Sequence, residues 1–359
     1  MSPDGIPPRA ALWRHPAGVF FALAAVFATA LPWIWLLPLD DPRLAHVRLG
    51  IFGFGGAAVT GYVLTAQRAW TGRDAPLPAP LLGALALAAR IAAFRWPEAA
   101  LAPALPLALV AGAVLWPVVM ARRWTRLPLA AVPLAMVFAE MALVRGRVPA
   151  DALPLAMAAL ILAVGGRAVP AFLASEPART PGTVATGPLW PGLGLAAMAM
   201  VPAETPAAIA LALAALWVST RVRGLRQAGA ANRMLALAYA ALAPGLAALA
   251  LGRVGALPPA AAEHLVTMGA MGPMVLAFAA RATMLRPERG ALRPRPLHRI
   301  AFATLFAAAV LRTAAGDPAP WITLAGAAWS GAWLAFLGAH LPALARPAPF
   351  PILSASRKM

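Results

Sequence analysis

The residues best suited to chemistry are two histidines within apolar segments, His46 and His264. Imidazole inside a hydrophobic slab is uncommon, and an ionisable group at membrane depth indicates a functional site. An imidazole nitrogen can be an axial ligand of haem iron or a ligand of copper. Two segments far apart in sequence place a histidine at the same expected depth, as ligation of one haem by two histidines requires. The sequence therefore predicts His46 and His264 as metal ligands.

Small residues lie below His46 at helical spacing, at Gly50, Gly53, Ala57 and Gly61. Such a stripe would let a flat ring such as haem lie against the helix backbone, beneath the imidazole. The same small-xxx-small pattern is also typical of two membrane helices in close contact. Both interpretations stay open at this point.

Thioethers follow His264 at i+4 and i+7, at Met268 and Met271. One imidazole and two thioethers on a helix stripe could hold copper, or offer an axial ligand to haem. The alternative is that these methionines are ordinary packing residues of an apolar core.

Arg48 lies two residues after His46 and therefore points to a different side of the helix. It could extend to water at the membrane interface, or it could bind a haem propionate through its guanidinium fork. The other three histidines are weaker candidates: we expect His15 and His298 to be solvated, and His340 to lie too far from His46 in depth.

The composition of the chain indicates which secondary-structure elements could position these residues. The 359 residues are 62% hydrophobic and 12% charged, whereas a soluble domain carries about 25% charged residues. Apolar runs long enough to cross a bilayer recur along the chain, and Ala and Leu dominate without period-two alternation. The sequence predicts an all-α polytopic membrane protein of about twelve transmembrane helices. These are expected near 17–38, 46–66, 77–94, 101–120, 128–144, 152–173, 189–203, 206–220, 234–252, 261–284, 298–315 and 319–344.

The distribution of positive charge sets the expected orientation. Most of the 30 Lys and Arg residues fall in segments that this alternation places inside, so both termini are expected in the cytoplasm. The net charge of +18 therefore indicates membrane orientation and no nucleic-acid partner. The expected division is a cytoplasmic tail at 1–16, a six-helix half at 17–173, a linker at 174–188, a second six-helix half at 189–344 and a tail at 345–359.

The sequence lacks the residues that several other kinds of functional site require. There is no cysteine, which excludes disulfides, thiolate metal sites and iron–sulfur clusters. Glu140 is the main acidic residue near the centre of an expected span, and no Walker-type loop or hydrolase motif is present. The sequence leaves open whether the protein is an enzyme.

Three stretches resemble the signature segments of the NnrS family, which are polytopic membrane proteins associated with bacterial nitric oxide response. They are Phe52-Gly53-Phe54 with the Gly61–Arg73 segment, Gly165-Gly166-Arg167 through Phe172, and His264 through Gly272 running on to Arg281. The resemblance implies a cytoplasmic-membrane protein of about twelve helices that contains haem and copper and is linked to nitric oxide tolerance in denitrifiers.

Departures from the family pattern affect its metal ligands. The family's second helix typically opens with a His-x-His-Glu-Met run, of which only His46 is present, with Arg48, Leu49 and Gly50 in the later places. A histidine expected at the start of the ninth span is Ala236, and the family's Gly-His-Thr-Gly loop is replaced by Arg286-Pro287-Glu288-Arg289. These losses weaken the case for copper and leave haem b, held by His46 and His264.

The resulting expectation is a multi-pass protein of the bacterial cytoplasmic membrane that binds haem near the periplasmic face. Its partners would be the lipid bilayer and nitric oxide or another small gaseous ligand. The alternative is a non-catalytic membrane subunit or a transporter-like protein that has lost the family's metal sites.

Overall fold

The computed structural model describes residues 10–74, 76–174, 190–201, 203–222, 228–287, 291–314, 319–349 and 351–353. Across these ranges the chain is all-α, as expected, and contains two isolated β-bridges but no strand. The chain divides into two compact units, each described by itself below.

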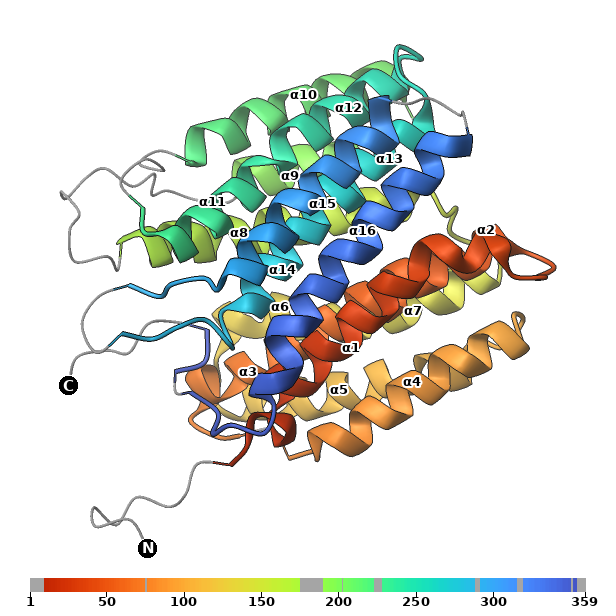
Figure 1. Cartoon of the computed structure of the whole chain (residues 1–359). Helices are drawn as coiled ribbons and strands as arrows, with labels where there is room; N and C mark the ends of the chain where they lie inside the picture. Colours follow the sequence, from red (N-terminus) through yellow and green to blue (C-terminus); the bar gives the residue numbers. More distant parts are fainter. Residues whose placement is uncertain are drawn as a thin grey trace, which may run out of the picture. The chain divides into compact units, whose positions relative to one another are not determined.

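The first unit comprises Met1–Ala150 together with Trp333–Ile352. Its helix α3 packs against α1, α5 and α7, while α4 packs against α1 and α5 (Figure 1). Its described elements are α1 (Pro16–Ala30), η2 (Leu31–Leu36), α2 (Pro42–Val47), η3 (Arg48–Gly55), α3 (Gly56–Thr71), α4 (Ala79–Arg95), α5 (Leu101–Met120), α6 (Leu127–Ala130), α7 (Val132–Val144) and the end of α16 (Ala319–His340).

The second unit comprises Asp151–Ala332 and Leu353–Met359. Within it, α12 packs against α10 and α13, and α11 packs against α8 and α14. Its described elements are α8 (Ala152–Ala174), α9 (Trp190–Met198), α10 (Glu204–Arg221), α11 (Ala230–Ala240), α12 (Leu242–Arg253), α13 (Pro259–Val266), η6 (Thr267–Met271), α14 (Gly272–Ala280), α15 (Pro296–Ala314) and most of α16.

Nine helical stretches within the described residues are long and apolar enough to cross a membrane. They are Pro16–Leu36, Pro42–Thr71, Leu101–Met120, Trp124–Val144, Ala152–Leu173, Ala230–Arg253, Pro259–Ala280, Pro296–Ala314 and Pro320–Ala343. The expected count of about twelve is therefore not confirmed. The other three expected spans correspond to α4, α9 and α10, of 17, 9 and 18 residues. At 1.5 Å per residue, α9 is only about 14 Å long, which is too short for a bilayer core of about 30 Å.

The segment that carries His46 is one continuous helical stretch from Pro42 to Thr71. It begins with a proline at its first position, and the Asp41 carboxylate accepts a hydrogen bond from the Leu44 N–H at 2.8 Å. It ends at Gly72, whose φ of +75° is a left-handed conformation that glycine adopts without strain. Local sequence thus fixes both ends of this helix.

A π-helical segment follows each of the two central histidines. In the first unit, η3 (Arg48–Gly55) begins two residues after His46, and in the second, η6 (Thr267–Met271) begins three residues after His264. Because i→i+5 hydrogen bonds put more residues in each turn than an α-helix has, the i, i+4, i+7 stripes expected for uninterrupted α-helices do not hold there. Such segments occur frequently at functional sites.

The domain boundaries expected from sequence stay a prediction. Apart from Ala174, the linker at 174–188 lies outside the described residues, as do residues 1–9 of the expected N-terminal tail and 354–359 of the C-terminal tail.

Candidate functional site

His46 lies near the end of α2 and is partly buried. Its Nδ1 lies 3.2 Å from the carbonyl oxygen of Leu31, which is the first residue of η2. Its ring also lies 5.4 Å from the ring of Trp35, centroid to centroid. A carbonyl oxygen only accepts hydrogen bonds, so Nδ1 carries the proton in this contact and Nε2 carries the lone pair.

The small-residue stripe below His46 packs against α1 and η2. A Cβ built on Gly50 would lie 3.5 Å from the Leu31 side chain, and one on Gly53 would lie 3.5 Å from Phe27. One built on Gly61 would lie 3.1–3.2 Å from Phe20 and Phe21. These contacts match the helix-packing interpretation of the stripe. A role for Gly50 and Gly53 in contacting a cofactor stays a prediction.

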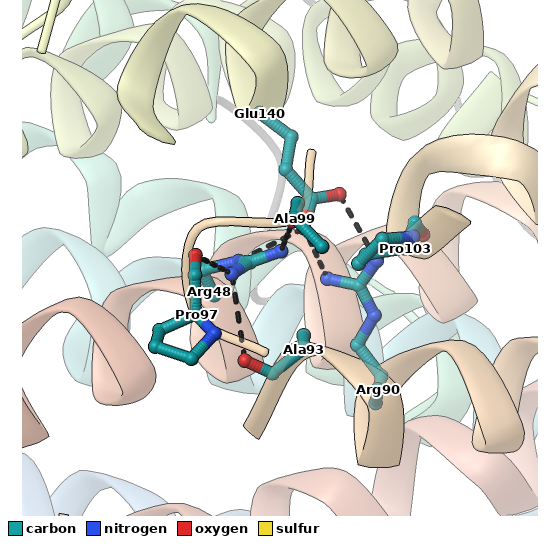
Figure 2. A network of polar contacts seen from close by, with 7 residues as sticks. All are labelled: Arg48, Arg90, Ala93, Pro97, Ala99, Pro103 and Glu140. Atoms are coloured by element: carbon teal, nitrogen blue, oxygen red, sulfur yellow. Dashed lines mark hydrogen bonds and ion pairs between the residues drawn. The ribbon is translucent and has the colours of Figure 1, made fainter. Parts of the chain in front are cut away.

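Arg48 belongs to a buried cluster of three charges that we call the charge triad: Arg48, Arg90 and Glu140. Figure 2 shows two guanidinium groups approaching one carboxylate from different elements. Arg48 Nε donates to Glu140 Oε1 at 3.2 Å, while Arg90 donates to Oε1 at 2.7 Å and to Oε2 at 3.0 Å. The three residues are 2%, 5% and 0% exposed. The triad therefore joins η3, α4 and α7 inside the first unit.

Backbone carbonyls complete the surroundings of the two arginines. Arg48 donates to the carbonyls of Pro97 at 2.7 Å, Ala99 at 2.8 Å and Ala93 at 3.5 Å. Arg90 donates to the Pro103 carbonyl. Buried cations need such acceptors, because removal from water is otherwise costly.

The triad corrects one interpretation of Arg48. The guanidinium points into the unit and does not extend to water at the interface. The structure gives it Glu140 as ion-pair partner, so a haem propionate would have to share it. The contact between Arg48 and a propionate stays a prediction.

His264 lies in α13 and is partly buried. Its Nδ1 lies 2.6 Å from the carbonyl oxygen of Ala260, one turn earlier in the same helix. By the same argument as for His46, Nδ1 donates and Nε2 carries the lone pair. In both histidines Nδ1 is thus fixed by a backbone carbonyl and Nε2 is the unprotonated nitrogen, a state that is usual for ligating histidines.

The thioethers after His264 are not on one α-helical stripe with it. Met268 and Met271 both lie within η6, and Met271 is buried among apolar residues. No group of three or more His, Cys, Asp or Glu side chains suited to a metal ion occurs in the described part of the chain. Met268 and Met271 as copper ligands and His264 as a haem ligand both stay predictions. Because His46 and His264 belong to different units, their pairing on one iron stays a prediction.

The remaining histidines have structural partners. His15 caps α1, with its Nδ1 accepting from the Ala17 N–H at 3.2 Å. His298 is fully buried, 3.3 Å from Thr283 Oγ1, so the expectation that it is solvated is wrong. His340 is also fully buried, and its Nε2 donates to the Gly18 carbonyl at 3.0 Å.

Sequence reasoning missed Arg90 and Glu140 as partners of Arg48. The available signal was the presence of three ionisable residues within apolar runs, since such groups pair with one another inside membranes. The sequence could not show which of these residues pair, because Glu140 lies 92 residues from Arg48 and 50 from Arg90.

These features define a multi-pass α-helical membrane protein with a buried charge triad and two helices in which a histidine precedes a π-helical segment. A comparison with protein-family models finds a match to the NnrS protein family over residues 11–348. The chain belongs to the NnrS family. None of the curated proteins compared with it matches.

Proposed function

We propose that this protein is a membrane haem protein in which His46 and His264 are the axial ligands of one haem b. The observation that supports this most is that both imidazole rings have the same tautomer. In each, Nδ1 donates to a backbone carbonyl, at 3.2 Å for His46 and 2.6 Å for His264, so Nε2 is the unprotonated nitrogen, as in histidines that ligate a metal. The π-helical segment after each histidine adds support, because such segments concentrate at functional sites.

The proposed physiological role is nitric oxide response or tolerance, in the bacterial cytoplasmic membrane with both termini in the cytoplasm. Family membership supports this role. Bound haem would supply reversible binding of a small gas or transfer of one electron. The protein's own residues would hold the two rings in one tautomer and orientation, through the carbonyls of Leu31 and Ala260. Copper has weaker support, because only Met268 and Met271 accompany His264 as soft ligands.

The test is haem content in protein purified in detergent from haem-supplied cells. We expect a Soret absorption band in the wild type and its loss in both His46→Ala and His264→Ala. The matched control is His15→Asn, which changes a histidine that caps α1 and should keep the band. A colourless wild type, or a band unchanged in both alanine variants, would exclude the proposal.

The charge triad favours a second candidate, a transporter-like protein or non-catalytic membrane subunit without metal. Ionisable residues inside membrane proteins mark solute and proton pathways as well as cofactor sites. This candidate predicts that clean protein contains no metal while a solute raises its thermal stability. Metal analysis of the same preparation used for the Soret measurement separates the two.

A further inference from the structure

The charge triad carries one excess positive charge. It contains two guanidinium groups and one carboxylate, and each of these residues is at most 5% exposed. Arginine stays protonated in proteins, so this excess cannot be removed by loss of a proton. A buried charge without a counter-charge is costly, and the cost falls when an ion of opposite sign binds nearby.

Both guanidinium groups also retain hydrogen-bonding capacity. Arg48 has acceptors within the described chain for four of its five N–H groups, through Glu140, Pro97, Ala99 and Ala93. Arg90 bonds only through its two Nη atoms, so its Nε–H has no acceptor among the described residues. The triad thus combines unbalanced charge with donors still available.

A cavity of about 180 Å³ lies next to Arg48. Its lining includes Arg48, Ala93 and Pro97, and Arg48 Nη1 donates to the carbonyls of Ala93 and Pro97. Arg48 is 2% exposed, whereas Asp40 and Arg95 of the same lining are exposed, so Arg48 forms the buried floor of this Arg48 cavity. Figure 2 shows the contacts that hold its guanidinium there. A water molecule occupies about 30 Å³ of liquid and drug-sized ligands need about 300 Å³ or more, so this volume suits a small ion with a few waters.

Two smaller cavities are lined by residues of the charge triad. One of about 10 Å³ is lined by both Arg48 and Arg90, and one of about 20 Å³ is lined by Arg90 with Phe27 and Gly53. Cavities of about 10–15 Å³ or more can hold a water. Water in them would satisfy the remaining donors of Arg90 without a second ion.

The rim of the Arg48 cavity is exposed and carries mixed charge. Asp40, Asp41 and Arg95 line it, and Glu98 lies close enough to act on Arg48 electrostatically. The Asp41 carboxylate already caps α2. Because rim charges are screened by water while the floor is buried, the field at the floor is dominated by the triad.

We propose that the Arg48 cavity binds one small monovalent anion, of the size of chloride, nitrate or formate, against the guanidinium of Arg48. The excess charge of the triad supplies the attraction. The proposed anion site needs no haem, so it can be tested in protein without cofactor.

The experiment measures thermal stability of the full chain in detergent against the concentration of potassium chloride, nitrate or formate, with gluconate keeping ionic strength constant. We expect saturable stabilisation by at least one of the small anions. Asp40→Asn, which removes a negative charge from the rim, should tighten binding by about two- to fivefold, and Arg95→Gln should weaken it by a similar factor. Both residues are exposed, so neither change should disturb folding.

Matched controls carry the same charge changes elsewhere, with Asp151→Asn for the first and Arg147→Gln for the second; both residues are exposed. Arg48→Lys keeps the charge but loses the planar fork, and should reduce the preference for planar nitrate and formate over chloride. Stabilisation that never saturates, or that shifts as much in the controls as in Asp40→Asn and Arg95→Gln, would overturn the proposal.

Discussion

The two histidine helices are alike at the histidine and differ below it. Each has a ring whose Nδ1 donates to a carbonyl, followed by a π-helical segment. His46, however, bonds to Leu31 of a different element, whereas His264 bonds to Ala260 of its own helix. Below His46 come the charge triad and glycines packed against α1 and η2, and below His264 comes a largely apolar segment whose glycines lie against Ala309 and Trp329.

The features that the two helices share differ in role from those that only the His46 helix has. The shared features are those a haem ligand needs, and they are local to each histidine. The charge triad and the close packing of α1 against α3 belong to the His46 helix, where they join elements of the first unit. We infer that the contact with Leu31 ties His46 to a second element, while the contact of His264 with Ala260 lies within its own helix.

The largest expected effect comes from Glu140→Gln, which would leave two buried guanidinium groups without a counter-charge. Removing one partner of a buried ion pair typically costs about 3–5 kcal/mol. The measurement is the unfolding temperature in detergent. Glu98→Gln is the control, because Glu98 is exposed, and it should change stability little. Equal effects of the two variants would show that the triad does not hold η3, α4 and α7 together.

A smaller effect should distinguish two particular glycines, Gly61 below His46 and Gly269 below His264. Gly61→Ala places a Cβ 3.1–3.2 Å from Phe20 and Phe21, whereas Gly269→Ala places one 3.7 Å from Ala309. Overpacking should destabilise the first by about 1–3 kcal/mol, while the second should be neutral or gain up to about 1 kcal/mol of helix propensity. Unfolding of both variants under one condition tests this, and a reversed order would contradict the packing difference.

The smallest effect uses His15, whose Nδ1 accepts a hydrogen bond where those of His46 and His264 donate one. Burial lowers the pKa of His15 to about 4 from 6.5, with a smaller opposing effect of Asp74 and a smaller lowering by Arg68. Between these values the unfolded chain binds a proton that the folded chain does not, so stability falls as pH drops from 6.5 to 4. His15→Asn retains a capping side chain and should make this fall shallower by about 1 kcal/mol. If the stability of the wild type and of His15→Asn fell in parallel between pH 6.5 and 4, the lowered pKa of His15 would be contradicted.

The fold class and the NnrS family could be predicted from the sequence, because apolar runs and the segments around His46 and His264 are local features. The π-helical segments could not, since apolar composition in η3 and η6 does not distinguish i→i+4 from i→i+5 bonding. The partner of Arg48 and the burial of His298 depend on contacts between distant elements. Apolar runs predicted α4 and α9 as spans, but the apolar pattern does not show where a helix ends, and these helices are only 17 and 9 residues long.

The proposal that most needs a test is that His46 and His264 would both ligate one haem. Electron paramagnetic resonance of the oxidised, haem-loaded protein tests it directly, because two imidazole ligands give a low-spin ferric spectrum. We predict that spectrum in the wild type and its loss in either single variant, His46→Ala or His264→Ala. A low-spin spectrum that survives unchanged in either variant would contradict the claim.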